Sequence, residues 1–98
     1  MIVSFGDKRT EDIYHGGTTT RTRRIPREIW NVARRKLDMI EYAHVLQDLR
    51  VPPGNRLETL GGALRGYHSI RINDQWRVIF QWTDGAAHQV SIADYHTG

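Results

Sequence analysis

The spacing of hydrophobic residues divides the chain into a helical first half and a strand-like second half. Residues 2–5 are rich in β-forming side chains, which predicts a short first strand. Asp7 can cap a helix over residues 8–15, and the Gly16–Gly17 pair is suited to end it. The stretch TTTRTRR at residues 18–24 has no apolar anchor, so we expect an exposed, basic connection.

A long amphipathic helix is predicted to begin near Pro26, a residue that suits the first helical position. Its apolar residues recur at spacings of three and four: Ile29, Val32, Ala33, Leu37, Ile40 and Ala43. A further helical turn is expected around residues 45–49. The sequence VPPGN at residues 51–55 then ends helical structure, because proline lacks a backbone donor and biases the residue before it towards extended geometry. Everything beyond this point has the pattern of a sheet.

Two alternating segments, residues 70–72 and 76–82, predict a β-hairpin. The apolar faces of paired strands must coincide, which makes residues 73–75 a three-residue loop. Arg71 then lies directly opposite Arg77.

The same rule makes residues 83–85 a second three-residue loop, with Gly85 at the position that needs a positive φ. Val90 and Ile92 then join the core face, and Ser91 is placed opposite Arg77. These elements predict one α+β domain over residues 1–98, with an N-terminal strand and two to three helices packed on an antiparallel sheet of about four strands.

Composition narrows the range of functions. The chain has 98 residues, a formal net charge of +3 and no cysteine, and arginine supplies most of the positive charge. Arginine matches phosphate oxygens in pairs, so nucleic acid is a plausible partner, although a solvated basic surface explains the same composition. The lack of cysteine excludes disulfides, zinc-thiolate sites, iron–sulfur clusters and thiol nucleophiles. Charge appears early and no apolar run approaches a membrane span, so we expect a cytoplasmic protein with no membrane partner.

Two arginines on one sheet face repel each other by some tenths of a kcal/mol to about one. Arg71 and Arg77 can therefore form a clamp for nucleic-acid phosphate. Alternatively, each can pair with a nearby carboxylate such as Asp74 or Asp94.

Near the end of the sequence, Asp94-Tyr95-His96 brings together an acid, a phenol and an imidazole. Alternation places Tyr95 on the face of the arginines, and Asp94 and His96 on the other. RNA cleavage through the ribose 2′-hydroxyl needs a base, a cation and an acid. With an ordinary pKa of about 6.5, His96 could perform either proton transfer. Alternatively, these three residues are ordinary exposed side chains with no catalytic role. No histidine has a partner at metal-site spacing, so we expect no metal and no cofactor.

The run NRLETLGGALRGYHSIRINDQWRVIFQWTDG, followed by IADYH, resembles the HigB toxins, also called plasmid-maintenance killer proteins, of the RelE superfamily. In the first half, ARRKLDMI and LRVPPGNRLE are the more recognisable pieces. The resemblance implies a RelE-like fold and metal-free cleavage of mRNA, typically on the ribosome. It also implies a HigA-type helix-turn-helix antitoxin, and contact with operator DNA only through the toxin–antitoxin complex.

By the same resemblance, Arg77 falls on the phosphate-stabilising arginine of the family, and Asp94, Tyr95 and His96 fall on its catalytic triplet. Glu58 falls where some members carry a reactive histidine. Glu58 could then act as a carboxylate base, a role for which Asp94 is the alternative, or orient His96. Further RNA contacts are predicted from the exposed arginines: Arg71, Arg65, Arg23 and Arg24.

A second departure from the family is LGGALRG, where many relatives read LKGDRKG and carry more charge. Arg65 partly compensates for that loss. Two alternatives to an mRNA endonuclease therefore stay open. One is a non-enzymatic gyrase inhibitor like the related ParE toxins, and the other is an attenuated toxin kept for regulation of its operon.

Overall fold

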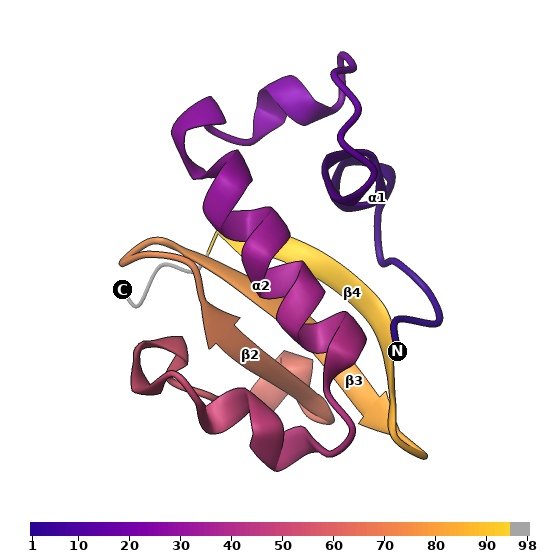
Figure 1. Ribbon diagram of the computed structural model, residues 1–98, viewed down its shortest axis with the longest axis vertical. Coiled ribbons are helices and arrows are strands. Elements are labelled where there is room, and N and C mark those ends of the chain that lie inside the picture. Colours follow the sequence, from indigo (N-terminus) through magenta and orange to yellow (C-terminus); the bar gives the residue numbers. More distant parts are fainter. Residues whose placement is uncertain (95–98) are drawn as a thin grey trace.

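The hydrophobic residues form a core between helices and one antiparallel sheet, as the sequence predicts. The computed structural model describes residues 1–94. Its two α-helices are α1 (Lys8–Tyr14) and α2 (Trp30–Tyr42) (Figure 1). The sheet has the strand order β1-β2-β3-β4 and consists of β1 (Glu58–Thr59), β2 (Tyr67–Arg71), β3 (Trp76–Thr83) and β4 (Ala86–Asp94). Short 3-10 turns connect these elements: Thr22–Arg24, Arg27–Ile29, Leu46–Arg50, Pro53–Asn55 and Gly62–Leu64. The α+β fold class is confirmed.

Helix α1 begins at the predicted cap and is tied to the end of β4. The Asp7 carboxylate accepts a hydrogen bond from the backbone N–H of Thr10 at 2.8 Å. The buried hydroxyl of Thr10 accepts from the N–H of Ile92 at 2.9 Å, while Arg9 donates to the Ile92 carbonyl at 3.0 Å. These side chains satisfy the β4 backbone where no further strand pairs with it, and so fix α1 against the sheet.

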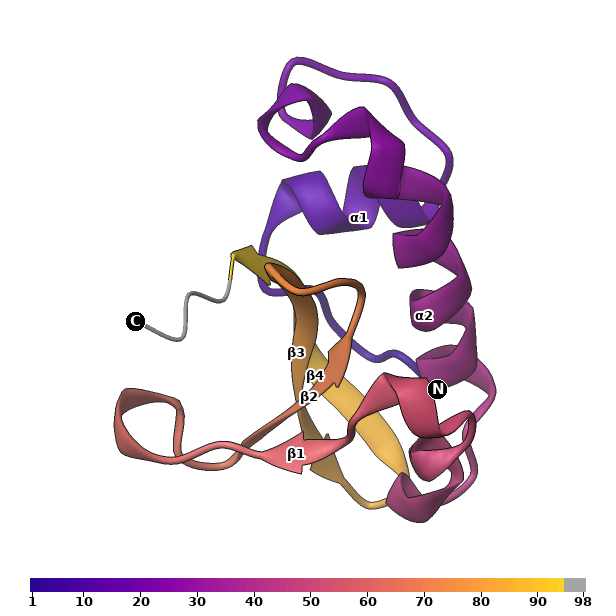
Figure 2. The same ribbon diagram turned by 90° about the vertical axis from the view of Figure 1, so that its left-hand side faces the viewer.

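Helix α2 packs its apolar stripe against one face of the sheet (Figures 1 and 2). The predicted residues Ile29, Ala33, Leu37, Ile40 and Ala43 are buried. Trp30 extends the stripe. Its indole N–H donates to the Ile25 carbonyl at 2.8 Å, so the one polar atom of this buried side chain has a partner. The facing sheet residues are Ile70, Val78, Phe80, Val90 and Ile92.

The turns around the proline pair are pinned to α2 by Asn55, which is fully buried. Its amide donates to the Leu49 carbonyl at 3.1 Å and accepts from Lys36 Nζ at 2.6 Å. Burial lowers the pKa of Lys36. A side-chain amide therefore replaces the backbone pairing that the prolines prevent.

The predicted N-terminal strand over residues 2–5 does not form as a continuous strand. Residues 2–5 run parallel to β4 but form only two isolated bridges, Ile2 with Ala87 and Phe5 with Val90. Between those partners, Gln89 has a φ of 53° and donates its N–H to the hydroxyl of Ser4 at 2.9 Å. This bulged residue interrupts the ladder, so a continuous strand cannot form.

The first hairpin has the predicted register, with Arg71 opposite Arg77. Its loop is ordered by Asn73, whose side-chain oxygen accepts from the N–H groups of Gln75 and Trp76 at 2.9 and 2.7 Å. The three-residue loop is confirmed, because Ile72 N–H donates to the Trp76 carbonyl.

The second hairpin differs from its prediction. Thr83 pairs with Ala86, so the loop has two residues, Asp84 and Gly85, with φ values of 53° and 75°. Two successive positive φ values are typical of a tight turn that matches the twist of the strands. Together with the bulge at Gln89, the shorter loop shifts the pairing by two residues. Arg77 therefore faces Ala93, not Ser91, while Val90 and Ile92 remain buried as predicted.

Candidate functional site

The candidate site lies on the face of the sheet turned away from α2. Side chains alternate along a strand, so Ser69 and Arg71 of β2 share this face with Arg77 of β3. Figure 2 shows α2 against one side of the sheet, whereas the β1–β2 loop projects on the opposite side. The alternation in the sequence thus gives the sheet one apolar face and one basic face.

Arg77 is held in place by groups from two neighbouring segments. One guanidinium nitrogen, Nη1, donates to the Ser69 hydroxyl at 2.9 Å and lies 3.5 Å from the carbonyl oxygen of Arg56. The other, Nη2, lies 3.4 Å from a carboxylate oxygen of Glu58. Only 12% of the Arg77 side chain is exposed, against 48% of that of Glu58. A partly buried cation is therefore presented beside an accessible carboxylate.

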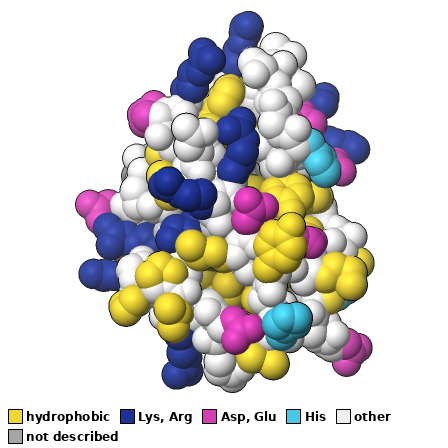
Figure 3. Space-filling model, in the orientation of Figure 1, with side chains coloured by type: hydrophobic (Ala, Val, Ile, Leu, Met, Phe, Trp, Pro, Cys, Tyr) yellow, Lys and Arg dark blue, Asp and Glu magenta, His cyan; other side chains and the backbone are white. Residues whose placement is uncertain are grey.

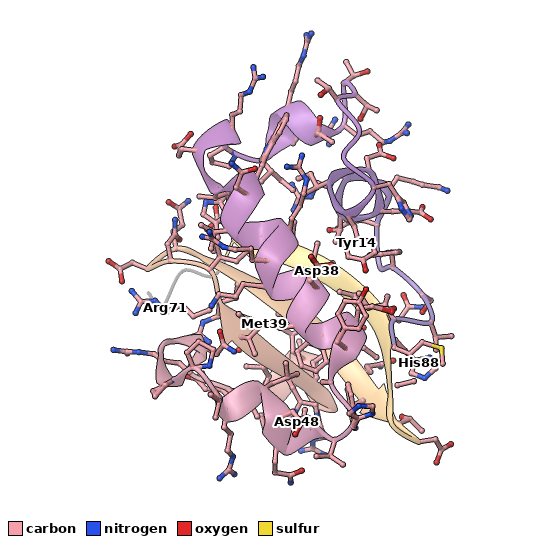
Figure 4. The ribbon with its side chains drawn as sticks, viewed as in Figure 1. Tyr14, Asp38, Met39, Asp48, Arg71 and His88 are labelled. Carbon is pink, nitrogen blue, oxygen red and sulfur yellow. The ribbon has the colours of Figure 1, made fainter. Side chains whose placement is uncertain are left out.

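Arg71, opposite Arg77, forms an ion pair with Asp74 in the hairpin loop. The structure thus supports the predicted pairing with a local carboxylate for Arg71, and it gives Arg77 a carboxylate partner in Glu58. These pairs offset the repulsion between the two cations. Figure 4 shows Arg71 on the opposite side of α2 from Tyr14 and His88.

Asp94 ends β4 and is the cross-strand partner of Trp76. This pairing places Asp94 on the opposite face of the sheet from Arg77, as alternation predicts. Its carboxylate accepts a hydrogen bond from the Gln75 side chain at 3.2 Å. Tyr95 and His96 lie outside the described residues, so their predicted roles stay predictions.

The other predicted RNA contacts are exposed and separate from the sheet face. Arg23 and Arg24 belong to the turn before α2, and Arg65 ends the turn Gly62–Leu64 in the β1–β2 loop. Among residues 1–94, none of these three has an ion pair. Figure 3 shows Lys and Arg side chains gathered over the upper and left parts of one face. Such unpaired cations can bind phosphate without first releasing a carboxylate.

Ser69 and Arg56 were not predicted as site residues. Ser69 did carry a signal, because it lies two residues before Arg71 and must share its face. The left-handed backbone of Arg56, with φ of 46°, carried none. His68 lies on the opposite face against Phe80, with ring centroids 5.9 Å apart, and burial lowers its pKa.

Neither a metal centre nor a membrane span is found in the part of the chain that the structure describes. No three His, Asp or Glu side chains within residues 1–94 are grouped to hold a metal ion. No helix of that range is long and apolar enough to cross a membrane. The expectation of metal-free chemistry stays a prediction.

Comparison with known proteins gives the family. The model of the RelE-like toxin of the type II toxin–antitoxin system HigB matches residues 3–96. Toxin HigB-1 of Vibrio cholerae serotype O1 is 48% identical over 87 residues, which cover 89% of this chain and 90% of that protein. Endoribonuclease HigB of Proteus vulgaris is 29% identical over 96 residues, covering 98% and 100% of the two chains.

Solved structures agree on the fold. YafQ from E. coli superposes with a TM-score of 0.63 at 13% identity, covering 96% of this chain and 93% of its own. YoeB in the YoeB–YefM complex from Staphylococcus aureus gives a TM-score of 0.59 at 18% identity, with 98% of each chain covered. The sequence matches and the shared fold show that the chain belongs to the HigB-like family, the RelE-like toxins of type II toxin–antitoxin systems.

Proposed function

We propose that this toxin is an endoribonuclease that cleaves mRNA on the ribosome through the ribose 2′-hydroxyl, without a metal. The observation that carries the proposal is the juxtaposition of Arg77 and Glu58, 3.4 Å apart, on the sheet face turned away from α2. A cation for the phosphorane and a carboxylate for proton transfer are thereby within reach of one phosphodiester. The relative from Proteus vulgaris, named endoribonuclease HigB, supports the endoribonuclease part of the proposal.

Each residue has a role in this scheme. Arg77 stabilises negative charge on the attacked phosphate. Glu58 removes the 2′ proton, because it is the carboxylate beside Arg77, and Asp94 is the alternative base. His96 protonates the departing 5′ oxygen, and Tyr95 positions a base or ribose. The surrounding cations bind backbone phosphates: Arg71, Arg65, Arg23 and Arg24.

The proposed partners follow from the toxin–antitoxin family. We propose a HigA-type helix-turn-helix antitoxin as the neutralising protein and operator DNA as a ligand of the complex alone. Ribosome and mRNA in the cytoplasm are the proposed targets of the free toxin.

The test incubates ribosomes and a defined mRNA with wild type, Arg77→Ala, Glu58→Gln or His96→Ala. We expect cleavage by wild type and losses on the order of 100-fold or more in the Arg77 and His96 variants, because single electrostatic and acid–base groups contribute that much. Intact message with folded wild type overturns the proposal. A gyrase supercoiling assay on the same preparation then tests the ParE-like alternative directly.

A further inference from the structure

A buried serine lies beneath the cation of the candidate site. Ser69 is fully buried in β2, and its hydroxyl accepts a hydrogen bond from Arg77 Nη1 at 2.9 Å. A buried hydroxyl without a partner is unfavourable, so this contact satisfies Ser69 as well as holding Arg77.

The strand register explains why Ser69 can reach Arg77. Ser69 pairs with Ile79 on one side and with Glu58 on the other. It is therefore a diagonal neighbour of Arg77, whose side chain leans from β3 across β2 towards β1. The guanidinium contacts Ser69 of β2 and Glu58 of β1.

The two guanidinium nitrogens have partners of different kinds. Nη1 meets the Ser69 hydroxyl and the Arg56 carbonyl, which are fixed parts of the sheet and its flanking loop. Nη2 meets Glu58, whose side chain is half exposed. A phosphate oxygen can replace Glu58 at Nη2 while the contacts at Nη1 persist.

We propose that Ser69 is a positioning residue, which fixes the orientation of the Arg77 guanidinium so that Nη2 meets the scissile phosphate. This inference rests on the proposed endoribonuclease function. An arginine side chain loses considerable rotamer freedom when it is fixed, and Ser69 imposes that order before substrate arrives. The benefit therefore falls on the chemical step more than on RNA binding.

The experiment measures ribosome-dependent mRNA cleavage by Ser69→Ala, with Ser91→Ala as the matched control. Ser91 lies on the same sheet face, in β4, and pairs with the same Ile79. For Ser69→Ala we expect kcat to fall about 10- to 100-fold, the range for a hydrogen bond to a charged group, with KM within about twofold. Ser91→Ala should match wild type. Ser69→Cys keeps the packing but offers only a weak acceptor to Arg77. If Ser69→Ala does not fold, Ser69→Cys takes its place in the assay and should show the same loss of kcat.

A double variant separates positioning from general destabilisation. If Ser69 acts through Arg77, Ser69→Ala has no further effect on the residual kcat of Arg77→Ala. Multiplicative losses in the double variant, or full activity of Ser69→Ala, overturn the proposal.

An NMR measurement keeps the inference separate from the cleavage assay. In wild type, restricted rotation should give the Arg77 Nη protons separate resonances, which should merge in Ser69→Ala. Unchanged resonances overturn the positioning role. Wild type that leaves mRNA intact overturns the proposed function instead, and the NMR comparison still decides whether Ser69 orients Arg77.

Discussion

The ion pair between Arg71 and Asp74 leads to a prediction about RNA affinity. Asp74 is almost fully exposed, at 96% of its side chain, whereas 28% of the Arg71 side chain is exposed. RNA phosphate competes with the Asp74 carboxylate for the Arg71 guanidinium. Asp74→Asn removes that competitor, and the loop should keep its shape because Asn73, not Asp74, accepts the hydrogen bonds that order it.

The size of the effect follows from the exposure of the pair. An exposed ion pair is worth about 0–1 kcal/mol, so its removal should lower the Kd for single-stranded RNA by up to about fivefold. Because the Debye length is about 10 Å at 0.1 M salt and about 3 Å at 1 M, the gain should shrink as salt is added. Fluorescence anisotropy with a labelled oligoribonucleotide measures it.

Asp84→Asn is the matched control, since it makes the same charge change in an exposed loop at the other end of β3. Eight residues of strand separate the two loops by roughly 25 Å. Equal tightening by Asp74→Asn and Asp84→Asn would mean that net charge alone is responsible. Tightening that persists in an Arg71→Gln background would likewise refute the displacement argument, as would an unchanged Kd for Asp74→Asn.

Three further predictions concern stability. Asn55→Ala should lower the free energy of unfolding by about 2–3 kcal/mol in urea titrations, because it leaves the buried Leu49 carbonyl without its donor; a change below about 0.5 kcal/mol would contradict this role. Gly85→Ala should cost about 1 kcal/mol in the same assay because φ is +75°, and an unchanged free energy of unfolding would contradict this. Burial lowers the pKa of His68 from 6.5, so the unfolded chain binds a proton first and stability falls as pH drops below about 6.5. His68→Gln should flatten that part of the profile, and an unchanged slope would exclude His68 as its cause.

Local chemistry was enough to predict several elements from the sequence. Asp7 caps α1 because a carboxylate next to the first turn satisfies a free N–H regardless of the rest of the fold. Asn73 orders its loop by the same kind of short-range contact. The apolar spacing in α2 set which face it buries.

Register in the second hairpin could not be obtained in this way. Alternation has a period of two, so it fixes the face of each residue but not its partner. The shorter loop and the bulge at Gln89 each shifted the pairing by one residue, so residues 90–94 kept their predicted faces whereas residues 86–88 exchanged theirs. Val90 and Ile92 were therefore placed in the core correctly, while Ser91 was assigned the wrong partner.

By itself, the sequence determined the fold class, the family resemblance and the opposition of Arg71 and Arg77, because each depends on residues that are close in the chain or on alternation. Only the tertiary structure decided what each arginine contacts. Glu58 and Ser69 reach Arg77 through the pairing of three strands, across separations of 19 and 8 residues. No local pattern specifies such contacts, since they depend on how the strands register and how the Arg77 side chain crosses them.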